Sequence, residues 1–99
     1  MSIKGLKIMV IAGVQFKILP ENVDTDLEDV KVNLQKKLKT LKGAIFNDFK
    51  EEPIAFGLKA LVLTFALPES EEVDLVQNEL QKVKGVSSVQ LIDYRRAVG

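Results

Sequence analysis

The chain has 99 residues, of which 46% are hydrophobic and 28% are charged, so it is long enough for one folded domain with a modest core. Fourteen basic residues balance fourteen acidic ones, and this neutrality argues against a dedicated nucleic-acid-binding protein, whose affinity depends on neutralising phosphates. The sequence has no cysteine and no histidine, which excludes disulfides, thiolate nucleophiles, histidine-based catalysis and metal sites built on either residue. We therefore expect no cofactor and no metal site, and a location in the cytoplasm.

Residues 6–19 predict a first strand, which Pro20 ends. Its second half alternates apolar and polar side chains, as a half-buried strand does: Val14, Gln15, Phe16, Lys17 and Ile18. The apolar run at residues 8–14 is far shorter than the roughly 20 residues that a membrane-spanning helix needs. It also runs directly into the alternating pattern, so we expect neither an export signal nor a membrane span.

A polar segment then leads into a first helix. Thr25, followed by Glu28 three residues later, matches a capping box, and Gly43 ends the helix. Apolar residues follow at three- and four-residue spacing, and form one stripe: Leu27, Val30, Leu34, Leu38 and Leu41. The helix ends in four lysines, Lys36, Lys37, Lys39 and Lys42, which fit a solvated helix terminus better than an RNA-binding patch.

The second half of the chain predicts two more strands, a helix and a last strand. Residues 44–51 and 56–67 have strand character, with Pro53 bending the chain between them. Ser70 is the predicted cap of a second helix, whose apolar stripe is Val73, Val76, Leu80 and Val83. Residues 86–94 are the last predicted strand, followed by Arg95, Arg96 and a short tail.

This order, βαββαβ, predicts a ferredoxin-like α+β sandwich. Right-handed crossovers place the first and third strands side by side in a four-stranded antiparallel sheet, with both helices on one face. Because this fold serves enzymes, RNA-binding modules and ligand sensors alike, the function has to be inferred from particular residues.

The segment between the second and third strands is the most informative part of the chain. Pro53 and Gly57 constrain the backbone on either side of Phe56, at a junction where a ring can project from the surface. From the pattern alone, Phe56 is either a core aromatic at the start of a strand or an exposed anchor for a partner.

Pro53, Ile54, Ala55, Phe56 and Gly57 closely resemble the Pro-Ile-(Ala/Gly)-Phe-Gly signature of the elongation factor 1-beta family, especially its archaeal members. The resemblance covers the chain from residue 13 onward. It implies a single guanine-nucleotide exchange domain at residues 13–99, with residues 1–12 as an amino-terminal extension that continues into the first strand. It also implies an interaction protein without covalent chemistry of its own, which promotes GDP release from the GTPase elongation factor 1-alpha.

The resemblance also implies roles for individual residues. In the family, the phenylalanine of the signature contacts the nucleotide-binding domain of the GTPase, and Phe56 stands at that position. Pro53, Ile54, Ala55 and Gly57 match the residues that present it. Lys59 matches a basic position after Phe-Gly and is a candidate partner contact, although a lysine at a sheet edge that only extends into solvent fits equally well.

The arginines near the carboxy terminus are the second candidate site. Eukaryotic members carry a lysine next to the carboxy terminus that acts on the magnesium ion of the GTPase, and Arg96, with Arg95 beside it, falls at that place. Mg²⁺ bridges the nucleotide phosphates, so disturbing it weakens nucleotide binding. This chain differs from that pattern, because arginine replaces lysine and three residues follow Arg96, whereas paired arginines are typical of archaeal members.

Two other functions share the predicted fold. An RNA-recognition module needs stacking aromatics on its third strand, where residues 58–61 are instead Leu, Lys, Ala and Leu. An acylphosphatase-like enzyme needs an Arg- and Gly-bearing phosphate loop after the first strand, but residues 20–24 contain neither residue type and carry two acids. RNA binding is the alternative function, and the resemblance does not imply a nucleic-acid partner.

Overall fold

The computed structural model describes residues 11–41 and 43–97. Four strands and two helices form the domain, with one short turn of 3₁₀ helix between the second and third strands. In chain order these are β1 (Ile11–Pro20), α1 (Leu27–Lys39), β2 (Ile45–Pro53), η2 (Ala55–Gly57), β3 (Lys59–Pro68), α2 (Val73–Gln81) and β4 (Val86–Ala97).

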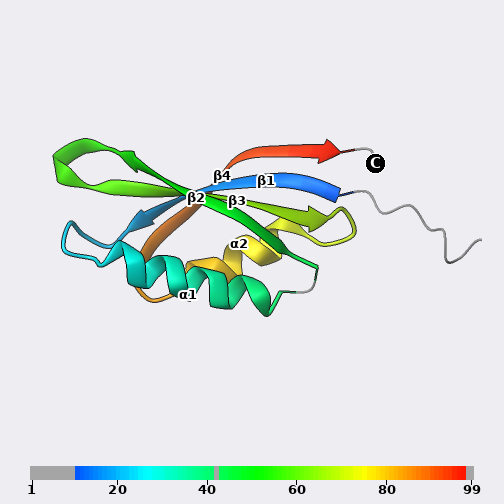
Figure 1. Cartoon of the computed structure of the whole chain (residues 1–99), viewed down its shortest axis with the longest axis horizontal. Helices are drawn as coiled ribbons and strands as arrows, with labels where there is room; N and C mark the ends of the chain where they lie inside the picture. The colour runs from blue at the N-terminus through cyan, green and yellow to red at the C-terminus, as the bar shows by residue number, and fades with distance from the viewer. Residues whose placement is uncertain (1–10, 42, 98–99) are drawn as a thin grey trace, which may run out of the picture.

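The sheet has the strand order β2-β3-β1-β4, and every neighbouring pair of strands is antiparallel. Both helices lie on the same side of this sheet, so the domain has two layers (Figure 1). The predicted ferredoxin-like βαββαβ sandwich is therefore confirmed, including the adjacent positions of the first and third strands.

The core lies between the sheet and the helix layer. Alternation along the two central strands points every second side chain at the helices, and each helix contributes one apolar stripe. Ten fully buried side chains are the largest in this core: Val14, Phe16, Ile18, Leu34, Leu38, Leu61, Leu63, Phe65, Leu67 and Leu80. Because β1 and β3 are buried in this way, they form a rigid base for the turns and strand ends beyond them.

The ends of three strands differ from the predicted ones. β2 continues through Pro53, which pairs with Lys59, so this proline ends a strand instead of bending the chain before it. A proline is tolerated here because β2 is an edge strand and needs no donor on its free side. β3 begins at Lys59 and not at Phe56, and β4 extends to Ala97, so Arg95, Arg96 and Ala97 belong to the sheet and not to a tail.

Both predicted helix caps are wrong. Asp26 caps α1, because its Oδ1 accepts hydrogen bonds from the backbone N–H groups of Glu28 (3.0 Å) and Asp29 (3.4 Å). Thr25 instead belongs to the preceding turn, where its Oγ1 accepts a hydrogen bond from the N–H of Asn22 at 3.2 Å. In α2 the cap position is Glu72, whose side chain makes no capping bond, and the helix starts after Ser70.

The amino-terminal prediction concerns residues 1–12. Residues 1–10 lie outside the described residues, whereas Ile11 and Ala12 are the first two residues of β1 and pair with Pro68 and Leu67. Within residues 11–41 and 43–97, neither helix has the length and apolar character needed to cross a membrane.

Candidate functional site

The tip of the β2–β3 hairpin is a tight, closed turn. The N–H of Ile54 donates to the carbonyl oxygen of Leu58 at 2.8 Å, and the N–H of Leu58 donates back to the carbonyl oxygen of Ala55 at 3.2 Å. Phe56 has φ 61° and ψ 33°, and Gly57 has φ 78°, which are values typical of the two central residues of a type I′ turn. The turn therefore has one defined conformation.

Phe56 occupies a position in this turn at which a phenylalanine is energetically unfavourable. Type I′ turns prefer Asn or Gly at their first central position, because a bulky residue with positive φ is strained. Phe56 is the only described non-glycine residue with positive φ, and its side chain is 94% exposed. It is not a core aromatic, and its strain is not offset by burial in the described part of the chain.

Glu51 connects the stem of this hairpin to the first helix. Its carboxylate lies 3.0 Å from Nζ of Lys31 on α1 and 3.8 Å from Nζ of Lys59 on β3. The hydrogen bond from Lys31 is the main cause that lowers the pKa of Glu51, and the same bond raises the pKa of Lys31. Lys59 remains more than half exposed despite this contact, so it is accessible to a partner.

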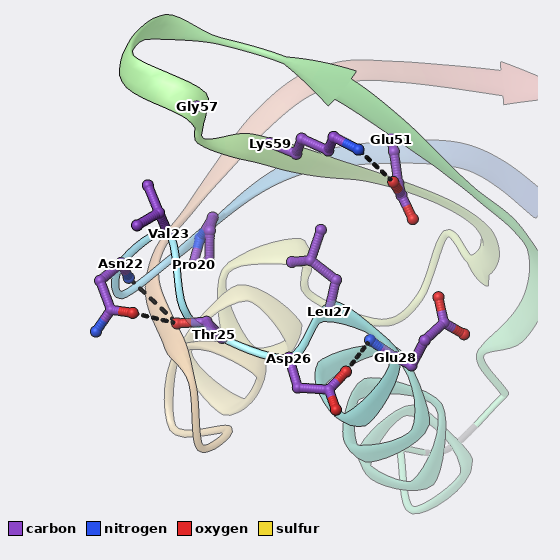
Figure 2. A pocket seen from close by; sticks show the side chains of 10 residues that line it. All are labelled: Pro20, Asn22, Val23, Thr25, Asp26, Leu27, Glu28, Glu51, Gly57 and Lys59. Atoms are coloured by element: carbon purple, nitrogen blue, oxygen red, sulfur yellow. Dashed lines mark hydrogen bonds and ion pairs between the residues drawn. The ribbon is translucent and has the colours of Figure 1, made fainter.

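A groove of about 380 Å³ separates this hairpin from the loop between β1 and α1, residues 21–26. Figure 2 shows the part of the hairpin that carries Gly57 and Lys59 above it, and Val23 and Leu27 rising from the loop and the helix start below. Its lining residues are Pro20, Asn22, Val23, Thr25, Asp26, Leu27, Glu28, Glu51, Gly57 and Lys59. The groove is thus adjacent to Phe56 through Gly57.

Val23 lines the groove, although the sequence alone predicts no role for it. Its side chain is 57% exposed, and a Cβ placed on Gly57 would lie 3.9 Å from its Cγ1 atom. The sequence does contain a pattern that could have indicated a surface role for Val23, because it is the single apolar residue in the polar run from Glu21 to Asp26.

The two arginines lie in a strand and not in a tail. Arg95 pairs with Gly13 and Arg96 with Ala12, both on β1. Successive side chains of a strand point to opposite faces of the sheet. The structure therefore separates Arg95 and Arg96, which the sequence places side by side.

Each arginine also has an acidic partner of its own. Nε of Arg96 lies 2.9 Å from the carboxylate of Glu69, just after β3, and Nε of Arg95 lies 3.1 Å from the carboxylate of Asp93. All four side chains are partly or largely exposed, so these ion pairs hold the arginines only weakly.

The hairpin tip and the arginines lie at opposite ends of the domain (Figure 1). Ala12 pairs with Leu67 on one side and with Arg96 on the other, so Arg96 is level with the far end of β3. Lys59 and Leu67 are separated by eight residues, or roughly 27 Å at the rise of an extended strand. The two candidate sites do not form one pocket.

Comparison with known proteins identifies the family. Residues 13–96 match the family model described as "EF-1 guanine nucleotide exchange domain", a range that includes both Phe56 and Arg96. The chain belongs to this family. It is 41% identical over 83 residues to "Elongation factor 1-beta" of Methanosarcina mazei, which covers 83% of this chain and 92% of the relative.

Two further relatives of the same name give similar values. Elongation factor 1-beta of Methanococcoides burtonii is 42% identical over 83 residues, which cover 83% of this chain and 91% of the relative. Elongation factor 1-beta of Staphylothermus marinus is 40% identical over 80 residues, which cover 79% of this chain and 87% of the relative. The resemblance seen in the sequence is thus confirmed. The chain is an archaeal-type guanine-nucleotide exchange factor of translation elongation, and its domain implies an elongation factor 1-alpha GTPase as partner.

Nothing in the described residues favours the RNA-binding alternative for this elongation factor 1-beta homologue. On the sheet face away from the helices, β3 presents only small or β-branched residues, Ala60, Val62, Thr64 and Ala66. The same face of β1 presents Gln15 and Lys17. Over the described residues of these two central strands, this face lacks the aromatic platform that single-stranded RNA needs.

Proposed function

We propose that this chain promotes GDP release from elongation factor 1-alpha, so that GTP can rebind, and that Phe56 anchors the complex. The observation that carries the proposal is an almost fully exposed phenylalanine, held in a strained conformation at the tip of a closed turn. Backbone strain of this kind concentrates at functional sites, and exposed aromatics supply much of the binding energy at protein interfaces. Pro53, Ile54, Ala55 and Gly57 present the ring.

Exchange needs no covalent chemistry from this chain and no cofactor. A factor that binds the nucleotide-free GTPase more tightly than the GDP-bound GTPase must weaken GDP binding by the same ratio, because the two equilibria are linked. The magnesium ion and both nucleotides are bound by the partner. We place the complex in the cytoplasm, where elongation occurs, and assign it no membrane contact.

The arginine end of the molecule supplies the second contact. Arg96 is the stronger candidate for acting on the magnesium and phosphate end of the GTPase, since it matches the family position. Its ion pair with Glu69 is exposed, and pairs of this kind contribute at most about 1 kcal/mol, so Arg96 can exchange Glu69 for an acidic group of the partner. Arg95 points to the other face and serves as the alternative.

The test is release of a fluorescent GDP analogue from the cognate elongation factor 1-alpha, at substoichiometric amounts of this chain and across a magnesium titration. We expect catalytic acceleration by the wild type, and Phe56→Ala to weaken the complex by more than about 1 kcal/mol. Leu75→Ala, which truncates another exposed apolar side chain on α2, is the control and leaves release unchanged.

Two results would contradict the proposal. A wild-type chain that does not accelerate release overturns the proposed function, and binding to single-stranded RNA is then measured. Acceleration that survives in Phe56→Ala keeps the exchange function but removes Phe56 as its anchor.

A further inference from the structure

We infer that the groove between the β2–β3 hairpin and residues 21–26 accepts a lysine or arginine side chain of the GTPase. Residues 21–26, with Val23 at their exposed tip, would then form the second half of the docking surface that begins at Phe56. This inference rests on the proposed function and extends it to a loop for which the sequence predicted no role. It is carried by the shape of the groove, its charge and its position.

The floor of the groove suits the aliphatic part of a long side chain. Pro20, Val23 and Leu27 supply apolar surface, and Val23 and Leu27 rise into the groove from below (Figure 2). Lysine and arginine are the residues that pack a long apolar stem on such a surface while keeping a charged end in water. A volume of about 380 Å³ accommodates one such chain.

The charge of the lining favours a cation. Three carboxylates line the groove, those of Asp26, Glu28 and Glu51, together with the ammonium of Lys59. Lys31, which is not part of the lining, lies 3.0 Å from the carboxylates of both Glu28 and Glu51, so the excess is one negative charge. Asp26 already accepts two backbone N–H groups at the start of α1, and Glu51 contacts two lysines. Glu28 is therefore the best placed of the three, since its side chain is 77% exposed and contacts only Lys31 among the described residues. A phosphate or carboxylate ligand would be repelled by the same groups, which leaves a cationic side chain as the fitting occupant.

The position of the groove identifies the GTPase as the source of that cation. Gly57 lines the groove and is bonded to Phe56, while Val23 lies beneath Gly57, so a surface that encloses the Phe56 ring also reaches Val23. Hydrogen bonds hold the loop of residues 21–26 in place in the free chain. Oδ1 of Asn22 accepts a hydrogen bond from the N–H of Asp24 at 2.9 Å, and the N–H of Glu21 donates to the carbonyl oxygen of Gly85 at 3.0 Å. A preordered loop loses little entropy on binding.

A matched pair of charge substitutions tests the inference. Glu28 and Asp74 are each the second residue of a helix, so Glu28→Gln and Asp74→Asn remove the same net charge from equivalent positions, and only Glu28 lines the groove. The measurement is the second-order rate constant for accelerated GDP release, taken at several salt concentrations. We expect Glu28→Gln to lower it about twofold to fivefold at low salt, as loss of one exposed ion pair does, and to flatten its salt dependence.

Charge reversal and a direct readout sharpen this test. Glu28→Lys should lower the rate constant about tenfold, because like charges then meet across the interface, whereas Asp74→Lys should change it less than about twofold. Independently, backbone amides of residues 21–28 should exchange hydrogen more slowly in the complex than in the free chain.

Each result decides something. If the wild type accelerates release but Glu28 and Asp74 variants behave alike, or residues 21–28 gain no protection, the groove inference is overturned and the exchange function stands. If the wild type does not accelerate release, the proposed function and this inference both fail.

Discussion

At the scale of single residues, Phe56 shows a conflict between local stability and binding. A residue held in the left-handed region costs on the order of 1–3 kcal/mol, unless it is Gly or a tolerant residue such as Asn. Phe56 carries that cost with 94% of its side chain in solvent, so the free protein gains nothing from the ring. The conformation is explained only if the ring acts on something outside this chain.

This conflict predicts that Phe56→Asn makes the domain more stable and less active. Asn suits the first central position of a type I′ turn, so we expect a gain of about 1 kcal/mol, or roughly 4–8 °C in the thermal midpoint of a domain of this size. Exchange activity should fall as far as in Phe56→Ala. Thermal unfolding and GDP release measure the two effects, and Phe56→Ala, which removes the ring but keeps the strain, is the control. A destabilised Phe56→Asn variant would show that the ring packs on the protein after all.

At the scale of elements, the hairpin is attached to α1 through Glu51 and Lys31, and this ion pair should give stability a specific pH dependence. Hydrogen bonding to Lys31 lowers the pKa of Glu51 in the folded state below its ordinary value of 4.5. The carboxylate therefore stabilises the fold above that ordinary value, and this contribution is lost as the pH falls through the lowered pKa.

We expect Glu51→Gln to reduce the free energy of unfolding at pH 7 and to have no effect once the carboxyl of the wild type is protonated. Urea unfolding at a series of pH values measures this difference. In a Lys31→Met background the same substitution should lose most of its pH-dependent effect, since the main cation that lowers the pKa is gone and only the longer contact with Lys59 remains. A difference that stays constant down to pH 2–3, roughly, would assign the effect of Glu51→Gln to packing.

Sequence patterns predicted the helices and strands themselves but not their ends. Both helices and all four strands were predictable, because apolar periodicity reports which face is buried. Their ends were not, since Thr25 and Asp26 are both good caps and only the preceding turn, in which Thr25 bonds Asn22, decides between them. Pro53 likewise marks either a bend or the end of an edge strand, and the difference depends on tertiary pairing.

At the scale of the whole molecule, strand order decides where the candidate sites lie. The motif around Phe56 was recognisable from its residues, but the left-handed backbone of Phe56 was not, because turn rules favour Asn there. The separation of Arg95 from Arg96 by the sheet required knowing that β4 continues to Ala97. The residues that line the groove together with Val23 come from β1, α1, β2 and β3. No local sequence pattern predicts that residues from these separate elements lie side by side.

This arrangement predicts that the two ends act independently. Phe56 and Arg96 lie roughly 30 Å apart along the strands, and substitutions this distant usually have additive free energies. Phe56→Ala should raise the concentration of exchange factor needed for half-maximal GDP release. Arg96→Gln should instead lower the maximal release rate and weaken its dependence on magnesium. Substitution is preferable to deleting residues 95–99, because deletion would also remove part of the pairing between β4 and β1.

The double variant Phe56→Ala/Arg96→Gln measures that independence directly. If Phe56 contributes binding and Arg96 acts on the magnesium end, the losses in the second-order rate constant multiply, and the coupling free energy between the two sites stays within about 0.5 kcal/mol of zero. Glu69→Gln serves as a control for Arg96, since it frees this arginine from its ion pair and should leave release as fast as in the wild type or faster. Strong coupling, or an Arg96→Gln variant that loses affinity but keeps its maximal rate, would mean that both ends serve only to hold the GTPase.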